Sequence, residues 1–406
     1  MTTDLKETTA PFDPAAVLRQ LPARPRLLAL GEPTHGENTL LALRNDLFRH
    51  LVEQEGYRTI ALESDCLMGL LVDDYVTTGE GDLDDVMDRG FSHEWGAFEG
   101  NRELVRWMRA HNTGRPAADQ VRFAGADGPL EISGAASPRQ ALTALHGYLS
   151  DRVDAGLLPV TADVLDTLIG PDARWTEPAA MTEPARATGQ SAEARELRLV
   201  ADDLETLLST QAPQLIATSS PDDWDRARLY GRTATGLLRY HFWMADTSPA
   251  RMTWLLGVRD AMIAANLLAA TQRGPTLAYA HNSHLQRNRS TMSMWGHPRL
   301  EWWGAGALVS SRLGQDYAVL TTALGTIEHQ GVGAPPSDTV EGLLYTLADD
   351  RVVVDPRGLA AALADAPPTD APPAARVSPW FGYAPLDPAH LADHDGLVFV
   401  RDVRPG

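Results

Sequence analysis

Two polar segments, each directly after a run of apolar residues, constrain the fold more than any other feature of the sequence. Residues 31–36 (GEPTHG) follow the run 27–30 (LLAL), and residues 280–284 (AHNSH) follow the run 276–279 (TLAY). Short runs of this kind are typical of buried strands. In an open α/β sheet, the carboxyl ends of the strands form the edge at which ligands bind. The histidines of both segments are therefore predicted to lie at that edge, where they could transfer protons.

Strand-like and helix-like segments alternate along the first third of the chain. Strands are expected at residues 26–30, 59–62 and 121–124, and helices at residues 40–55, 66–76 and 99–111. This alternation predicts β-α-β units, in which the strands run parallel and the crossovers are right-handed. Strand-like runs return at residues 276–280, 318–321, 352–354 and 397–400.

Between these strand-rich parts, helical periodicity dominates from about residue 137 to residue 271. The predicted fold is α/β, with a mostly parallel central sheet flanked by helices and an inserted helical lobe that forms one side of the active-site cleft. The core would comprise residues 1–130 and 272–406, and the lobe residues 131–271, in one continuous catalytic unit. Residues 170–190 lack clear periodicity, which predicts a mobile loop.

The charge of the chain limits its partners. With 35 basic and 54 acidic residues the net charge is −19, so the surface repels nucleic-acid phosphates and anionic lipid headgroups. The sequence lacks both an apolar run of about 18 residues and an amino-terminal signal segment, so we expect a cytoplasmic protein that binds neither membranes nor nucleic acid. A single cysteine, Cys66, excludes an internal disulfide and a multi-thiolate metal site. The sequence leaves the oligomeric state undetermined.

Glu32 and His35 share the first polar segment, where flanking glycines permit a tight turn. A histidine beside a carboxylate suits a general base, because the carboxylate stabilises the imidazolium that forms when water gives up a proton. The alternative is an ordinary strand-to-helix turn, in which Thr34 caps the helix and His35 faces solvent.

Two further acids follow predicted strands. Glu63 interrupts an apolar run, where a buried carboxylate needs a partner, and it could orient a histidine or act as an acid or base. Alternatively, Glu63 belongs to a helix-capping cluster with Ser64 and Asp65. Asp127 repeats the acid at the end of a strand, so three acids and a histidine would gather along one edge of the sheet.

His281 and His284 lie three residues apart and could share the face of a helix. The zinc signature His-Glu-x-x-His is absent, although a site of His35, His281, His284 and a carboxylate is conceivable in three dimensions. We therefore expect neither a metal nor another cofactor, with a metal site as the second hypothesis.

Two more groups could contact a substrate. His93, Glu94 and Trp95 lie in a glycine-punctuated loop, which either lines a pocket for an apolar ring or folds its aromatic side chains onto the core. Arg259 lies on a predicted helix at residues 252–270, where it belongs either to a charged pair on a core-facing stripe or to a solvated face.

At these positions the sequence resembles the erythromycin esterase family. The resemblance rests on five segments in order, namely residues 31–36, 61–65, Trp95 with 107–112, Arg259-Asp260 with Met262 and Asn266, and 280–284. It implies an α/β core with helical additions, an open cleft, and hydrolysis of a macrolide lactone by water that the first histidine activates.

Carried over to this sequence, the resemblance makes His35 the general base and makes Glu32 and Glu63 its supporting carboxylates. His281 would polarise the carbonyl or stabilise the oxyanion, and Arg44 would bind developing negative charge. His284 matches the second histidine of the paired motif. With the residues named above, the predicted substrate-binding set is His284, His93, Glu94, Trp95, Asp127 and Arg259.

The sequence thus predicts a metal-independent hydrolase that cleaves an ester or lactone of a bulky, largely apolar natural product. One alternative is a biosynthetic enzyme that uses the same site for acyl transfer, cyclisation or rearrangement. A metal-dependent hydrolase and a non-catalytic binder of a hydrophobic compound are the others. Each of them requires a small-molecule ligand.

Overall fold

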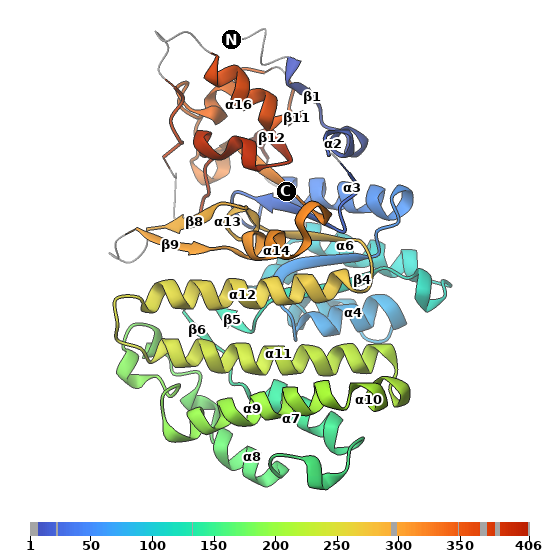
Figure 1. The fold of residues 1–406 in the computed structure, drawn as a ribbon. Coiled ribbons are helices and arrows are strands. Elements are labelled where there is room, and N and C mark those ends of the chain that lie inside the picture. The colour runs from blue at the N-terminus through green and yellow to red at the C-terminus, as the bar shows by residue number, and fades with distance from the viewer. Residues whose placement is uncertain are drawn as a thin grey trace. The chain divides into compact units, whose positions relative to one another are not determined.

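The computed structural model describes residues 7–21, 23–131, 133–293, 299–347, 349–365, 372–377 and 382–404. Within these residues, an eight-stranded sheet has the order β1-β11-β12-β10-β2-β7-β3-β4 (Figure 1). Its strands are β1 (Thr9–Pro11), β2 (Leu27–Glu32), β3 (Thr59–Asp65), β4 (Arg122–Asp127), β7 (Thr276–His281), β10 (Tyr317–Ile327), β11 (Arg351–Val354) and β12 (Gly396–Val403).

The central strands run parallel, which confirms the predicted α/β class. β2 pairs in parallel with β7 and β10, β7 also pairs in parallel with β3, and β10 with β12. Every residue of β2, β3 and β7 is buried, as expected of strands covered on both faces. The register places Glu32 opposite His281, so the polar ends of two strands distant in sequence lie side by side.

One edge of the sheet departs from the β-α-β pattern. β11 pairs antiparallel with both β12 and β1. The apolar run at residues 352–354 predicts a strand correctly, but a short buried strand has the same residue pattern in either direction. Its direction was therefore not predictable from that run.

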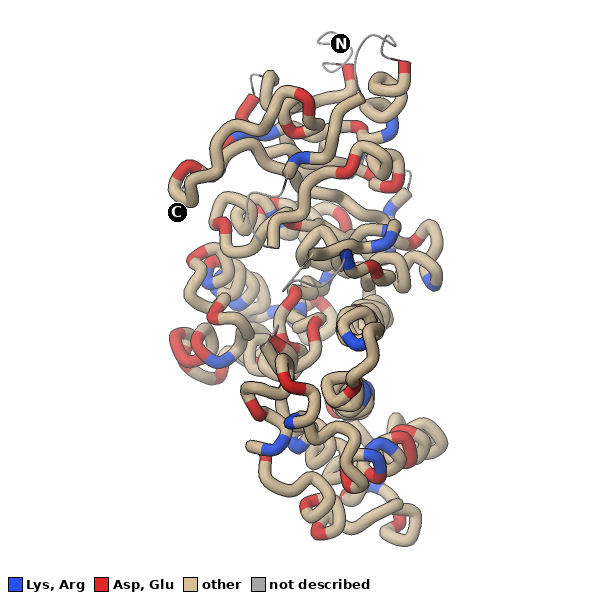
Figure 2. Tube along the Cα trace, turned by 90° about the vertical axis from the view of Figure 1, so that its left-hand side faces the viewer, with Lys and Arg blue, Asp and Glu red and all other residues tan. Residues whose placement is uncertain are grey.

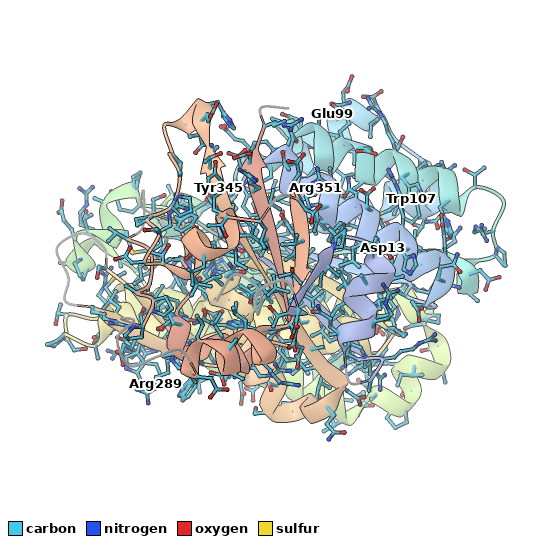
Figure 3. All side chains as sticks on the ribbon, turned by 90° about the horizontal axis from the view of Figure 1, so that it is seen from above. Asp13, Glu99, Trp107, Arg289, Tyr345 and Arg351 are labelled. Atoms are coloured by element: carbon cyan, nitrogen blue, oxygen red, sulfur yellow. The ribbon has the colours of Figure 1, made fainter. Side chains whose placement is uncertain are left out.

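Helices α3 (Asn38–Gln54) and α6 (Glu99–Asn112) contribute to the same hydrophobic core as the strands. Trp107 of α6, labelled in Figure 3, belongs to this packing. Its ring packs edge-to-face on that of Phe48 of α3, with 5.6 Å between ring centroids. Other helices of this part are α2 (Pro14–Gln20), α4 (Gly69–Thr78), α5 (Leu83–Arg89), α13 (Asn282–Leu285), α14 (Ala305–Leu313), α15 (Val340–Tyr345) and α16 (Pro356–Ala364).

The chain divides into two compact units. The first comprises residues 1–64, 68–126 and 267–406, and the second comprises residues 65–67 and 127–266. The second unit is mainly helical, and α11 packs against both α7 and α9 within it. Its helices are α7 (Arg139–Ser150), α8 (Ala162–Ile169), α9 (Ala192–Thr210), α10 (Ala212–Thr218), α11 (Pro221–Met244) and most of α12 (Arg251–Thr271).

Residues 170–190 differ from the loop that the sequence predicts. They contain three short 3-10 helices, η4 (Asp172–Arg174), η5 (Pro178–Met181) and η6 (Pro184–Arg186). Trp175 is buried, and its indole N–H donates to the carbonyl of Ile169 at 2.9 Å. Short 3-10 turns have no amphipathic period over ten or more residues, so a periodicity search does not detect them.

Acidic and basic residues are interspersed along the traces of both units (Figure 2). Among the described helices, none combines the length and the apolar character that a bilayer crossing requires.

Candidate functional site

The ends of three parallel strands supply the acids and one histidine of the site. Glu32 closes β2, His281 closes β7, and Glu63 lies near the end of β3. Gly31 is required here because a Cβ at this position would lie 2.2 Å from the side-chain oxygen of Asn282. Gly36 has a φ of 83°, a left-handed conformation that lets the chain turn directly after His35.

Glu32 fixes the orientation of the His35 ring. Nδ1 of His35 lies 2.7 Å from Oε1 of Glu32, and the Tyr279 hydroxyl donates to Oε2 of the same carboxylate. Because a carboxylate can only accept a hydrogen bond at this contact, the neutral His35 ring carries its hydrogen on Nδ1 and its lone pair on Nε2. The His35 side chain is 33% exposed, so solvent or a substrate can reach it.

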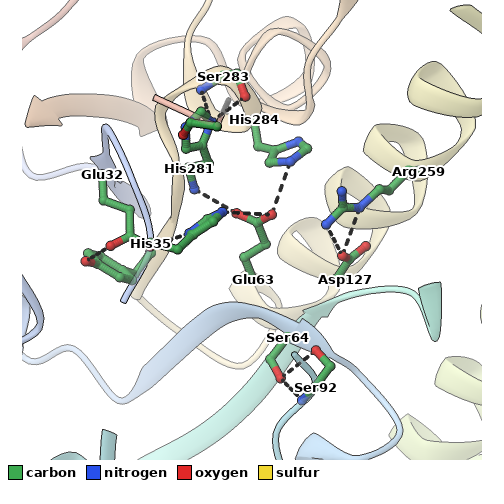
Figure 4. A network of polar contacts seen from close by, with 12 residues as sticks. Glu32, His35, Glu63, Ser64, Ser92, Asp127, Arg259, His281, Ser283 and His284 are labelled. Carbon is green, nitrogen blue, oxygen red and sulfur yellow. Dashed lines mark hydrogen bonds and ion pairs between the residues drawn. The ribbon is translucent and has the colours of Figure 1, made fainter. Parts of the chain in front are cut away.

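Glu63 lies among three histidines (Figure 4). The backbone N–H of His281 donates to Oε2 of Glu63 at 2.7 Å, and Nε2 of His284 lies 3.2 Å from Oε1. Nε2 of His35 lies 3.9 Å from the same Oε1, beyond direct hydrogen-bond distance. The nitrogen that carries the lone pair of His35 thus faces a carboxylate oxygen.

Opposing effects act on the pKa of His35. Burial lowers the pKa, but the charges of Glu63 and Glu32 and the hydrogen bond to Glu32 raise it more, so the pKa lies above its ordinary value. The carboxylates therefore stabilise the imidazolium form of His35.

His281 is held in one neutral tautomer. Its Nε2 lies 2.9 Å from the carbonyl oxygen of Gly382 and 3.2 Å from that of Pro33, so Nε2 carries the hydrogen. Its Nδ1 accepts from the hydroxyl of Ser283 at 2.6 Å. Burial, with the charge of His35 as the next cause, lowers the pKa of His281 to about 3. His281 is thus an N–H donor at neutral pH. The sequence analysis assigned no role to Ser283, which holds the other ring nitrogen.

Trp95 covers one side of His35. The two ring centroids are 4.8 Å apart, and the ring of His93 lies 5.3 Å from Trp95 on the same loop. His93 and Glu94 have φ values of 57° and 58°, which are strained for residues with a side chain. A Cβ on Gly96 would lie 1.6 Å from the carbonyl oxygen of Met87, so the loop packs closely against the backbone of Met87 at this position.

Arg44 is buried in the protein interior next to Tyr279 and is only 1% exposed. Its guanidinium donates to Asn101 Oδ1 at 2.8 Å and to Asn45 Oδ1 at 2.7 Å, and it lies 5.0 Å from the Tyr279 ring centre. Asn101 in turn donates to the carbonyl of Trp95 at 3.0 Å. Burial lowers the pKa of Arg44 to about 10, so it stays charged at neutral pH. The geometry favours positioning of Tyr279 and Trp95 by Arg44 over contact with a substrate anion.

Asp127 and Arg259 belong to the second unit and bind each other. Nη2 and Nε of Arg259 lie 2.6 and 2.9 Å from Oδ2 of Asp127, whose side chain is buried. The sequence analysis weighed a charged pair of Arg259 with its neighbour Asp260, whereas the ion pair that the structure shows joins Arg259 to Asp127.

The structure therefore brings Glu32, His35, Glu63, His281 and His284 together, with Trp95 and His93 beside them. Glu94 is exposed on the same loop. Tyr279 and Asn101 complete the network, and the sequence analysis assigned neither a role. A buried tyrosine that ends an apolar run next to AHNSH is the only signal that could have pointed to Tyr279.

Among the described residues, no group of three or more histidine, cysteine, aspartate or glutamate side chains has the geometry to hold a metal ion. Both ring nitrogens of His281 already contact protein atoms. A metal ligand needs a lone pair directed at the ion, and its other ring nitrogen then donates to a second partner.

The family model of erythromycin esterase matches residues 52–403 of the chain. Over 118 residues the chain is 29% identical to erythromycin esterase type II of Escherichia coli; the aligned segment covers 29% of the chain and 27% of that protein. The chain thus spans about a quarter of the length of the curated relative that it matches.

Solved structures show the same fold. A Bacillus cereus protein superposes with a TM-score of 0.71 at 17% identity, covering 100% of this chain and 97% of that chain. A variant of erythromycin esterase EreC in its open conformation superposes with a TM-score of 0.68 at 18% identity, covering 97% and 94%. Because the family model covers most of this chain, the chain belongs to the erythromycin esterase family.

Proposed function

We propose that this protein hydrolyses an ester or lactone bond of a bulky, largely apolar natural product, with a water molecule that His35 activates. The arrangement of His35 between Glu32 and Glu63 carries the proposal. It gives a partly exposed imidazole a fixed tautomer and two carboxylates that stabilise its charged form.

The first step is proton removal from water. A water molecule bonded to both His35 Nε2 and Glu63 Oε1 can lie beside the 3.9 Å line between these atoms. As its oxygen attacks the substrate carbonyl, its proton moves to Nε2, and the new imidazolium is stabilised by Glu32 at Nδ1 and by Glu63. The proton then passes to the departing alkoxide, which restores His35.

His281 supplies the hydrogen bond for the oxyanion. Its Nε2–H now donates to backbone carbonyls, that of Gly382 at 2.9 Å being nearer. A substrate carbonyl that replaces Gly382 would accept this hydrogen bond, which strengthens as negative charge develops on the oxygen. The low pKa of His281 keeps its second ring nitrogen unprotonated, so the residue donates without taking part in proton transfer.

Tyr279 and Arg44 act as positioning residues in this scheme. Tyr279 holds the second oxygen of Glu32, and Arg44 lies over the Tyr279 ring. This assignment replaces the anion-binding role that the family resemblance implied for Arg44, because its donors point to Asn45 and Asn101 inside the protein.

The remaining predicted residues would shape the binding site. Trp95 offers an apolar surface next to His35, which suits a bulky apolar substrate, and His93 supports Trp95. His284 and Glu94 complete the proposed substrate-binding set of the first unit. Contact of a substrate with Asp127 and Arg259 of the second unit stays a prediction. The curated relative is an erythromycin esterase, which makes macrolactones the first substrates to test. Absence of a metal cofactor and a cytoplasmic location are part of the same proposal.

The test is mass spectrometry of a macrolactone panel incubated in isotope-labelled water with the wild type, with His35→Gln, and with His50→Gln as a matched control on α3. Addition of one labelled water by the wild type and the control, with a loss of about 100-fold or more in His35→Gln, is the expected result. Hydrolysis that persists in His35→Gln would refute His35 as the base. Loss of water from a substrate, or an isomer of unchanged mass, would refute hydrolysis and favour ring formation or rearrangement.

A further inference from the structure

A groove on the second unit lies between two helices that pack side by side, α9 and α11. Its volume is about 410 Å³, within the range of sites for small organic ligands. The lining residues are Arg195, Arg198, Leu199 and Asp202 of α9, and Thr235, Leu238 and Arg239 of α11.

Each helix presents one face to this groove. The lining positions of α9 follow the spacing i, i+3, i+4 and i+7, and those of α11 follow i, i+3 and i+4. Phe242 continues the α11 spacing, and the guanidinium of Arg198 lies 4.6 Å from its ring centre. The groove is thus built from regular helix surface with fixed spacing.

The groove collects positive charge in a chain of net charge −19. Three of the lining side chains, Arg195, Arg198 and Arg239, are cationic, and only Asp202 is anionic. Within the described residues, none of these three arginines makes an ion pair. Burial, and next the charge of Arg239, lower the pKa of Arg198, so these two guanidinium groups lie close enough to repel each other. Neighbouring cations that form no ion pair with a carboxylate favour the binding of an anion.

Apolar side chains accompany the charges. Leu199 of α9 is 68% exposed although it is a large hydrophobic residue. On α11, Leu238 lines the groove but is itself buried, and the Phe242 ring lies beside the Arg198 guanidinium. Thr235, in contrast, donates its hydroxyl to Glu205 at 3.1 Å and offers little to a polar ligand. The groove therefore combines cationic donors with an apolar wall.

We propose that this groove binds an organic anion with an apolar body, such as a medium-chain carboxylate. Arginine donors would hold the carboxylate, since a planar guanidinium matches its two oxygens, and Leu199 with Phe242 would contact the alkyl chain of the ligand. The site lies in the second unit, whereas His35, Glu32 and Glu63 belong to the first. The proposal thus goes beyond the hydrolase function and does not depend on it.

The test is isothermal titration calorimetry, which measures the binding of three probes to the full chain. The probes are octanoate, 1-octanol and inorganic phosphate. The variants are Arg198→Gln, Arg239→Gln, and Arg186→Gln as a control in the same unit, where Arg186 pairs with Glu177 at 2.7 Å. Circular dichroism confirms that each variant is folded. We expect one octanoate per chain, about tenfold or more weaker binding in each groove variant, and no change in Arg186→Gln.

Each other outcome has a defined meaning. Octanol that binds as tightly as octanoate would overturn recognition of the anion, and phosphate that binds as tightly would overturn the apolar part of the proposal. Octanoate binding that is absent, or unchanged in Arg198→Gln and Arg239→Gln, would refute the site. The His35→Gln variant should bind octanoate like the wild type, which separates this proposal from the hydrolase function.

Discussion

Replacement of Tyr279 by Phe removes one hydroxyl group from the centre of the network. In the structure this hydroxyl donates to Oε2 of Glu32, and both side chains are buried. The contact of the Tyr279 ring with Arg44 is retained, because phenylalanine presents the same aromatic face. The substitution therefore isolates one hydrogen bond to a carboxylate.

The expected cost follows from the charge of the acceptor. A hydrogen bond to a charged group contributes about 1.5–3 kcal/mol to stability, against about 0.5–1.5 kcal/mol for a neutral one. Tyr57→Phe is the matched control, because the buried Tyr57 hydroxyl donates to the neutral carbonyl of Pro25 at 2.8 Å in the same unit. Tyr279→Phe should thus lower the free energy of unfolding by about 1 kcal/mol more than Tyr57→Phe does.

The effect on catalysis should be separate from the effect on stability. With one oxygen of Glu32 released, the carboxylate no longer fixes the His35 ring, and kcat should fall about 10- to 100-fold with little change in KM. Tyr57→Phe should leave kcat unchanged. Urea unfolding followed by circular dichroism gives the stabilities, and steady-state kinetics gives kcat and KM. Equal stability losses in the two variants, or wild-type kcat in Tyr279→Phe, would refute the reasoning.

Four further predictions concern the candidate site and the loop beside it. Because the proposed base His35 must be deprotonated and its pKa is raised, kcat/KM should be lost as pH falls through a midpoint above the ordinary histidine value, as a pH–rate profile would show. Glu63→Gln removes the largest of the effects that raise this pKa, so the midpoint should move to lower pH; a midpoint that stays in place would contradict the role of Glu63. Gly96→Ala should destabilise the fold by about 1–3 kcal/mol through contact of the new Cβ with the Met87 carbonyl, measured as a shift in the urea midpoint. Prolonged dialysis against a chelator should leave turnover unchanged if the reaction needs no metal, whereas a loss restored by a divalent ion would favour the metal-dependent alternative.

The fold and the core of the site could be predicted because they depend on local patterns. Apolar runs followed by GEPTHG and AHNSH indicate parallel strands, and parallel strands bring the residues at their carboxyl ends to one edge. His35 and Glu32 lie three residues apart in one turn, so their contact needs no distant segment. The positions of Glu63 and His281 at this edge follow from the same argument. The groups that form hydrogen bonds with them could not be predicted in this way.

What the sequence could not supply are contacts between segments that are distant in the chain. Tyr279 and Glu32 are separated by 247 positions, and a hydrogen bond between them exists only because β2 and β7 are neighbours. The direction of β11 likewise depends on pairing with distant strands, because its apolar run is compatible with a parallel or an antiparallel neighbour.

The sequence by itself thus determined the α/β class and the meeting of Glu32 with His281 at one sheet edge, because residue periodicity and strand polarity are local properties. The family followed from the resemblance of five short segments. Only the tertiary structure decided which nitrogen of His35 holds the lone pair, that His281 is a neutral donor, and that Arg44 is buried. Protonation states and charge roles depend on burial and on partners from distant strands and helices, which exist only once the chain has folded.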